Sequence, residues 1–422
     1  MTEPQQGPRK ALLGASIPRS GHHYLQRILS SYYGSEMYYC EWYGPPDCCR
    51  QVPCTRAGFR VTYQKSHDWD FALPQDVGDA LYLIQYRHPV PEALSDRDLM
   101  RDAIAGPSFN YRLTRDHYGW WLAGKAVYYR KFHQKWFERR VPNAVYVNYD
   151  LLTQQPMQTI TPILQWVDGE FGADRLAGAI AEASPTRSVA RENYKPRVIE
   201  DSKHFDRDLL GAFEAYILSQ CPKFEFEPLL SGSYETHWLY GLILLQDSEA
   251  PLPAGENDRL TAAAKRAPEH PEVLIRLARR EMEQGNSSGA IELLEKALMH
   301  SPHFGQAYRL LVEASKAAGR PLPAAITGSD ALFACAEHPA ALVEIARTMM
   351  NEERLVNALA ALSLVSVVQP ENFRAHHMLA RTLIRLGRWA EARGHAQRAA
   401  ELKPDHEQNN RMLESIREHL GR

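Results

Sequence analysis

A repeat of 34 residues in the C-terminal half constrains the fold of this 422-residue chain more than any other sequence feature. Prolines recur on this step, with alanine replacing one of them: Pro268, Pro302, Ala336, Pro370 and Pro404. Two further series keep the same step, namely Ala290, Ala324, Ala358 and Ala392, and Gly285, Gly319 and Gly387. An unrelated helical bundle would not place three series in one register, so repeated helix pairs are indicated.

This period, with small residues at helix contacts and proline at the repeat end, resembles the tetratricopeptide repeat. Each helix pair exposes an apolar face that only the next pair can bury, and alanine lets the helices approach closely. Residues 234–267 resemble a degenerate first repeat, and residues 407–420 resemble a polar-faced capping helix. We therefore expect an all-α tetratricopeptide repeat solenoid over residues 233–422.

Residues 1–232 have a different pattern, in which short apolar runs alternate with amphipathic stretches. The runs are rich in Val, Leu, Ile and Tyr and predict strands at 10–16, 59–65, 80–86 and 144–148. Helix-like segments at 24–33 and 115–140 lie between them. Strands alternating with helices predict an α/β domain with a mostly parallel sheet, whose ligands bind beyond the carboxyl ends of the strands.

The composition is that of an ordinary globular protein, with 44% hydrophobic and 24% charged residues. The formal net charge of −2 provides no global field for nucleic acid or anionic membrane, so any anion must be bound by a local pocket. The N-terminal sequence MTEPQQGPRKALLGAS lacks the features of a signal peptide, and no apolar stretch approaches the length of a membrane span. We expect a cytoplasmic protein with no membrane span.

Four of the six cysteines lie close together in the sequence, at Cys40, Cys48, Cys49 and Cys54. Their spacing differs from the paired C-x2-C of common zinc sites. Free thiols in an irregular loop are favoured in a reducing compartment, and a metal site or disulfides are the alternatives.

The first predicted strand leads directly into the segment Ser16-Ile-Pro-Arg-Ser-Gly-His-His23 and then into a helix. A strand, a tight turn and a helix N-terminus form an anion site, because unpaired N–H groups and the positive end of the helix dipole converge there. Arg19 adds a guanidinium suited to phosphate or sulfate, and Gly21 lets a ligand approach the backbone. The side chains of Ser20, His22 and His23 add hydrogen-bond donors.

This loop differs from a Walker A loop, because Gly14 and Gly21 are wrongly spaced and two histidines replace Lys-Ser/Thr. It resembles the 5′-phosphosulfate loop of sulfotransferases that use 3′-phosphoadenosine-5′-phosphosulfate (PAPS). That loop reads Pro, Lys or Arg, Ser, Gly and two hydroxyl residues. The resemblance implies a P-loop-like phosphate site in which the following residues hold the 5′-phosphosulfate: Arg19, Ser20, Gly21, His22 and His23. His22 and His23 depart from the family pattern.

A second motif follows the third predicted strand, where Arg87 precedes a helix that carries Ser95 eight residues later. It resembles the family's 3′-phosphate motif, which implies that Arg87 and Ser95 bind the 3′-phosphate of PAPS. A late basic segment at 193–197 with Lys203 corresponds to the family's closing loop. Trp42, Tyr43 or Tyr194 are candidates to stack on adenine.

The second predicted strand ends in Gln-Lys-Ser-His-Asp at 64–68, which resembles the Lys-Thr-His motif of cytosolic sulfotransferases. The resemblance implies that His67 is the general base, with a pKa near neutrality, and that Lys65 assists at the transferring group. Arg19 would stabilise the leaving phosphate. Asp68 or Asp70 could instead orient His67 or act as the base. The resemblance implies no metal requirement.

The sequence thus predicts an enzyme that transfers a sulfuryl group from PAPS to a hydroxyl or amine of an unidentified saccharide, small molecule or peptide. The alternative is a catalytically inactive nucleotide-binding scaffold with repeats that bind a protein partner or a second copy. A P-loop phosphotransferase is disfavoured by the missing Lys-Ser/Thr. Aromatic residues could line an acceptor cleft or form a buried core face: Tyr118, Trp120, Trp121, Tyr128 and Tyr129.

Overall fold

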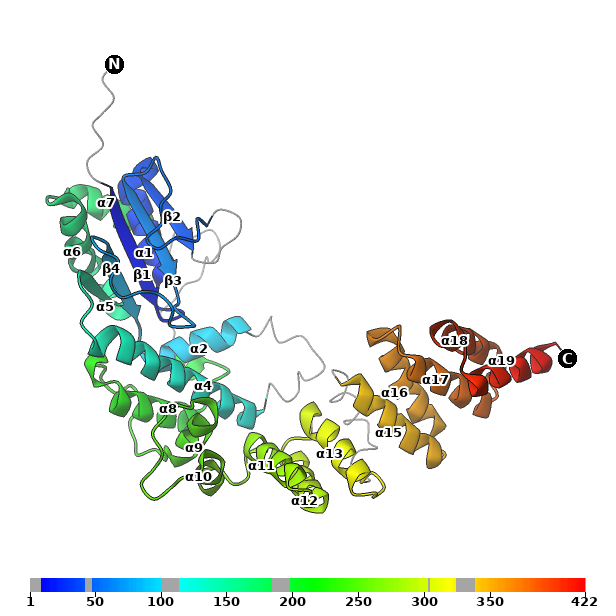
Figure 1. Cartoon of the computed structure of the whole chain (residues 1–422). Coiled ribbons are helices and arrows are strands. Elements are labelled where there is room, and N and C mark those ends of the chain that lie inside the picture. The colour runs from blue at the N-terminus through cyan, green and yellow to red at the C-terminus, as the bar shows by residue number, and fades with distance from the viewer. Residues whose placement is uncertain are drawn as a thin grey trace. The chain divides into compact units, whose positions relative to one another are not determined.

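The computed structural model describes residues 9–41, 48–100, 114–183, 198–302, 304–323 and 338–421. The chain forms two compact units (Figure 1). Unit 1 comprises Met1–Ala103 and Leu122–Thr236, and unit 2 comprises Ile104–Trp121 and His237–Arg422. Unit 2 therefore includes a short segment that lies in sequence between the two parts of unit 1.

Unit 1 contains a five-stranded sheet with the strand order β2-β3-β1-β4-β5. Every neighbouring pair is parallel, which confirms the predicted α/β class. The strands are β1 (Lys10–Ser16), β2 (Met37–Glu41), β3 (Val61–Ser66), β4 (Leu81–Tyr86) and β5 (Ala144–Asn148). The sequence had not indicated β2, a short edge strand whose middle residues are half-buried, so that its apolar signal is weak.

The other main elements of unit 1 are helices. They are α1 (His22–Tyr33), α2 (Pro89–Met100), α4 (Arg115–His133), α5 (Tyr149–Gln154), α6 (Pro156–Asp168), α7 (Ala173–Ala183) and α8 (Arg207–Gln220). Leu12 of β1 and Leu83 of β4 belong to a core with residues of α1, α6 and α7. Figure 1 shows these three helices beside the sheet. Neighbouring strand residues point the other way, since Tyr82 packs on Trp136, after α4, with ring centroids 5.6 Å apart.

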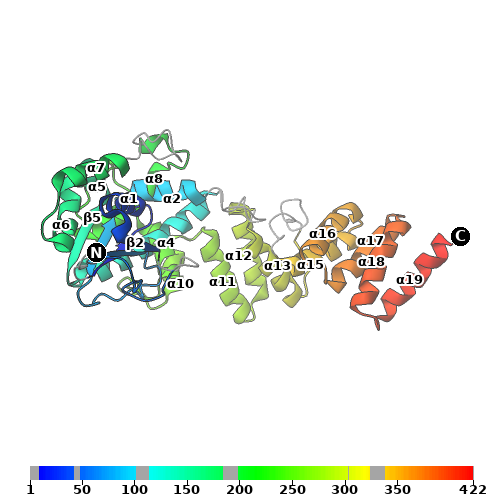
Figure 2. The ribbon, with the colours of Figure 1, turned by 90° about the horizontal axis from the view of Figure 1, so that it is seen from above.

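Unit 2 is helical. Its helices are α9 (His237–Gln246), α10 (Arg259–Arg266), α11 (Pro271–Glu283), α12 (Ser287–His300), α13 (Gly305–Ala317), α15 (Pro339–Asn351), α16 (Leu355–Val368), α17 (Phe373–Arg385), α18 (Trp389–Leu402) and α19 (Glu407–Leu420). Helices α11, α13, α15, α17 and α19 each begin 34 residues after the previous one. Figure 2 shows the helix pairs following one another along unit 2. The predicted repeat register is thereby confirmed.

The repeated small residues have two structural roles. Ala290, Ala358 and Ala392 are completely buried between helices. The glycine series lies at the turns that follow α11, α13 and α17, with φ values of 80°, 62° and 76° at Gly285, Gly319 and Gly387. Glu353 stands at the missing step and keeps the left-handed conformation, with a φ of 60°. Ala324 and Ala336 lie outside the described residues.

Within the described ranges, no helix is both long and apolar enough to cross a membrane.

Candidate functional site

The loop between β1 and α1 is a tight turn held by its own backbone. The amide of Ser20 donates to the carbonyl of Ile17 over 3.3 Å, and the Ser20 hydroxyl donates to the same oxygen over 2.6 Å. Arg19 adopts the left-handed conformation with a φ of 60°. No side chain in the described part of the chain caps α1. An uncapped helix start after a tight turn suits an anion.

Gly21 is required by its neighbours as well as by the turn. Its φ is 81°, and a Cβ there would lie 2.5 Å from the ring of Tyr149. The need for glycine thus comes from packing inside the protein, in addition to the ligand approach expected from the sequence. Tyr149, which sequence reasoning missed, directly follows β5 at the edge of the sheet where the carboxyl ends of the strands lie. That position was the available signal.

The two predicted phosphate motifs meet at Arg19. Its Nε donates to the Ser95 hydroxyl of α2 over 3.0 Å, and its carbonyl oxygen accepts from Nη1 of Arg87 over 3.1 Å. The Arg87 guanidinium lies 4.1 Å from the ring centroid of Tyr149. Its Nε is buried without a hydrogen-bond partner among the described residues. The turn and the end of β4 therefore bring two guanidinium groups to one site.

His67 and Lys65 extend this site along the end of β3. Nε2 of His67 lies 2.7 Å from Nζ of Lys65, and Nδ1 lies 2.8 Å from the carbonyl oxygen of Ser16. Only a donor can bond a carbonyl oxygen, so Nδ1 carries the proton and Nε2 accepts from the lysine ammonium. The His22 ring lies 5.1 Å from the His67 ring.

Burial lowers the pKa of each imidazole in this group. The pKa of His67 falls to about 4, first because the ring is buried and then because of the charge of Lys65. Burial and Lys65 also lower the pKa of His22 to about 2, and burial lowers that of His23. The expectation of a His67 pKa near neutrality is therefore wrong for the free protein. Burial lowers the pKa of Lys65 to about 8.

Asp68, the alternative base or orienting group, faces away from His67. Its Oδ2 accepts from Nζ of Lys135 over 2.7 Å and from the indole of Trp136 over 3.0 Å. Its Oδ1 accepts from the amide of Leu73 over 2.8 Å. Asp68 therefore fixes the turn after β3, and the Ser16 carbonyl orients His67 instead. Asp70 accepts from the amide of Ala72 in the same turn.

The aromatic residues of α4 do not form one cleft or one core face, because they lie in different parts of the protein. The hydroxyl of Tyr128 donates to the carbonyl oxygen of His67. Tyr129 is fully buried in the core of unit 1. The remaining members, Tyr118, Trp120 and Trp121, belong to unit 2. Trp69, which the sequence had not indicated, is 60% exposed and lies 5.5 Å from the His67 ring between ring centroids.

Several other candidates were named from the sequence. Trp42, Tyr43, Tyr194 and the segment 193–197 lie outside the described residues, and Lys203 is exposed after them. The clustered cysteines are free thiols: Cys40, Cys48, Cys49 and Cys54.

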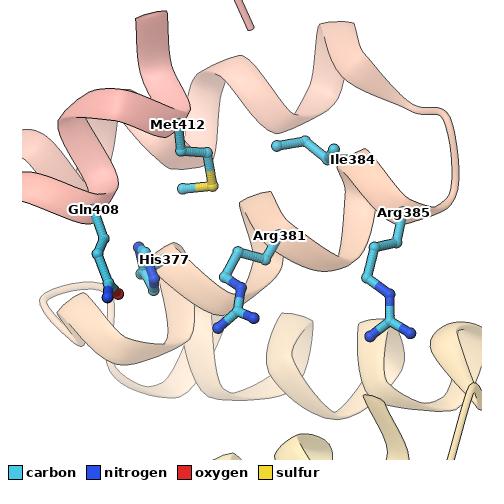
Figure 3. A pocket seen from close by; sticks show the side chains of 6 residues that line it. All are labelled: His377, Arg381, Ile384, Arg385, Gln408 and Met412. Carbon is cyan, nitrogen blue, oxygen red and sulfur yellow. The ribbon is translucent and has the colours of Figure 1, made fainter. Parts of the chain in front are cut away.

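Unit 2 has a pocket of its own, with a volume of about 360 Å³ (Figure 3). Its lining comes from α17 and α19: His377, Arg381, Ile384, Arg385, Gln408 and Met412. Arg385 is held by the carbonyl of Met350 at 2.8 Å and by Glu353 at 2.6 Å. This pocket combines cationic, imidazole and apolar side chains on the two helices.

Comparison with known proteins finds one family match, in the C-terminal part of the chain. The tetratricopeptide repeat family matches residues 373–406, which span α17 and α18, and confirms the predicted repeat there. No sulfotransferase family matches the parallel α/β unit. No curated protein sequence matches the chain.

Solved structures also show similarity to part of the chain, among them the following two. The first tetratricopeptide domain of Spaghetti (RPAP3), bound to the HSP90 peptide SRMEEVD, is 15% identical, with 36% of this chain and 96% of that chain covered and a TM-score of 0.21. The MamA protein is 22% identical, with 35% and 83% covered and a TM-score of 0.28. Neither TM-score is high enough to support a conclusion about this chain.

Proposed function

We propose that unit 1 is a sulfotransferase that moves a sulfuryl group from PAPS to a hydroxyl or amine acceptor. The observation that supports it most is the position of Arg19, which contacts both Ser95 and Arg87. Two short motifs distant in sequence thus form one cationic site at the carboxyl ends of β1 and β4. A ligand with phosphate groups at both ends of a nucleoside fits such a site.

The proposed reaction is an in-line displacement at sulfur. The acceptor oxygen or nitrogen forms a bond to sulfur while the bond between sulfur and the 5′-phosphate oxygen breaks, releasing 3′-phosphoadenosine-5′-phosphate (PAP). Charge develops on the leaving oxygen, which Arg19 and Lys65 would stabilise. The acceptor proton passes to Nε2 of His67, whose other nitrogen already donates to Ser16.

Lys65 has a second role in this proposal. In the free protein its ammonium hydrogen-bonds Nε2 of His67, the atom that must accept the proton. When PAPS binds, the Lys65 ammonium hydrogen-bonds the sulfate oxygens in place of His67. The lone pair on Nε2 of His67 is then free to accept the acceptor proton. The anion also raises the pKa of His67, because a nearby negative charge stabilises the imidazolium. The reaction requires no metal ion.

The acceptor would approach from the side of Trp69, whose exposed indole lies beside His67. An exposed aromatic ring can stack on a saccharide, a phenol or a peptide side chain. The proposal therefore specifies the nucleophilic group and leaves the rest of the acceptor open. We also propose a cytoplasmic location, which the free cysteines support.

The test is a comparison of ligands on the full-length chain. We expect PAP to raise the melting temperature more than ATP with magnesium, because only PAP carries the 3′-phosphate. A screen of acceptors with radiolabelled PAPS then measures transfer directly. Stabilisation by ATP with magnesium and none by PAP would contradict the proposal and favour a phosphotransferase.

A catalytically inactive nucleotide-binding scaffold is the second candidate. The repeat match and the pocket on α17 and α19 support a partner-binding role, and the low pKa of His67 makes it a weak base before any ligand binds. In this case PAP binds, but no acceptor in the screen receives label. Partner or self-association through the repeats is compatible with both candidates.

A further inference from the structure

Three side chains with metal-ligating atoms meet beside the start of α1. They are His22, His23 and Glu41, whose ligand atoms all lie within 4.8 Å of one another. Nε2 of His22 is 3.9 Å from Oε1 of Glu41. In the part of the chain that the structure describes, no other three His, Cys, Asp or Glu side chains gather their ligand atoms this closely.

The topology of unit 1 produces this arrangement. His22 and His23 are the first two residues of α1, and Glu41 is the last residue of β2. Strands β1, β3 and β2 are parallel, so the carboxyl end of β2 lies at the same edge of the sheet as the start of α1. The three ligands therefore come from two elements fixed by the sheet.

The chemistry of the set suits a transition metal. Two imidazole nitrogens and one carboxylate oxygen are ligands of sites that leave coordination positions open. Zinc bonds of about 2.0–2.2 Å place neighbouring ligand atoms roughly 3.3 Å apart, closer than the 3.9 Å between His22 and Glu41 and than the 4.8 Å within which all three ligand atoms lie. Small side-chain rotations would close that difference, because His23 and Glu41 are exposed.

The carboxylate of Glu41 is also oriented by a hydrogen bond from a neighbouring side chain. The hydroxyl of Tyr39 donates to Oε1 of Glu41 over 2.9 Å. Hydrogen bonds of this kind orient ligating carboxylates in metal sites. The contact provides a second observation at the site that does not involve either histidine.

We propose that His22, His23 and Glu41 bind one divalent transition-metal ion, with zinc as the expected ion. The inference does not depend on sulfuryl transfer, and it adds a metal to a loop for which the sequence resemblance implied none. The ammonium of Lys65 opposes the ion, since its charge acts on both imidazoles. Removing that charge should therefore strengthen metal binding.

The experiment uses the full-length chain freed of metal with a chelator and titrated with Zn²⁺ against a chromophoric competitor. We expect one equivalent to bind, and His23→Ala and Glu41→Gln each to weaken binding about tenfold or more. Lys65→Met should bind more tightly than the wild type. His300→Ala, which removes an exposed histidine on α12, is the matched control and should change nothing.

Cobalt distinguishes this site from the cysteines. Bound Co²⁺ should show a visible spectrum without a thiolate charge-transfer band, because no sulfur is a ligand. A thiolate band, or Zn²⁺ affinity unchanged in both His23→Ala and Glu41→Gln, would overturn the proposal, as would absence of binding to the wild type. PAP affinity, measured on metal-free protein, reports separately on the proposed sulfotransferase.

Discussion

The two units differ in how clearly the sequence indicates their structure. In unit 2 the same small residues recur every 34 positions, and helices begin at the same spacing. In unit 1 the candidate site is assembled once, from Arg19, His67 and Arg87 after different strands and from Ser95 of α2. A repeat can therefore be recognised in the sequence from its period. A site whose residues come from different strands has no period, and it can be recognised only from the contacts between those residues.

Replacing His67 should give the largest effect, because Nε2 of this imidazole is the atom proposed to take the acceptor proton. His67→Ala is expected to lower turnover roughly a hundredfold to ten-thousandfold while PAP binding is retained. Acceptor labelling and calorimetry with PAP measure the two quantities. Loss of PAP affinity instead would make His67 part of the phosphate pocket. His300→Ala serves as the control.

A core substitution in unit 2 tests whether the units are energetically separate. Leu379 of α17 is completely buried in the repeat core, so Leu379→Ala should destabilise unit 2 by about 2–5 kcal/mol. PAP affinity at unit 1 should not change. Denaturant unfolding followed with and without PAP checks both expectations. If Leu379→Ala also weakened PAP binding, the repeats would be shown to support the phosphate site.

Arg87 should matter for one phosphate in particular. Arg87→Ala is expected to weaken PAP binding by about 2 kcal/mol, roughly thirtyfold, through loss of a charged contact. Binding of the analogue without the 3′-phosphate should change little. Arg347→Ala, at an exposed arginine of α15, is the matched control. Equal losses for both ligands would mean that Arg87 acts through the Arg19 carbonyl that it holds.

The pH dependence of kcat/KM tests the lowered pKa values of the free protein. His67 is neutral above a pKa of about 4, and Lys65 is charged below a pKa of about 8. The rate should be flat between these values and should fall about tenfold per pH unit above the upper one, as Lys65 loses its proton. A rise centred near pH 6.5 would show that burial does not lower the pKa of His67.

The smallest expected effect lies at the break in the glycine series. Glu353 has a φ of 60°, a conformation that costs a residue with a Cβ about 1 kcal/mol relative to glycine. Glu353→Gly should therefore raise the stability of unit 2 by up to about 1 kcal/mol, less the contribution of its exposed ion pair with Arg385. Thermal unfolding measures the change. Glu352→Gly, one residue earlier, should destabilise instead.

Sequence patterns predicted the regular elements better than the site. Strands 10–16 and 144–148 and the helix at 407–420 have the expected bounds, since the strands are short runs of strand-forming residues and the helix follows from the repeat. The edge strand β2 was missed, since half-buried tyrosines and a terminal glutamate give little alternation. The sequence did not single out Glu353, because a glutamate gives no signal where the other repeats have glycine, yet its backbone has the same left-handed conformation.

The contacts that define the candidate site depend on three-dimensional neighbours. The sequence placed Arg19, Arg87 and His67 at strand ends, but not the Tyr149 ring against Gly21 or the Ser16 carbonyl that orients His67. The pKa of His67 could not be predicted either, because it depends on burial and on the distance to Lys65. Whether these residues bind PAPS stays a prediction.

The constant interval between helix starts means that unit 2 can change length by whole modules and keep its repeat register. Pro339 and Phe373 occupy equivalent places at the beginnings of α15 and α17, so excising or duplicating the stretch between them keeps every later apolar face turned toward its neighbour. Inserting a single residue inside a helix would rotate all following positions by about 100° and expose the buried alanines. Duplication of a whole module is thus expected to preserve the packing between helices, whereas insertion of one residue inside a helix is not. The number of modules sets the length of the array.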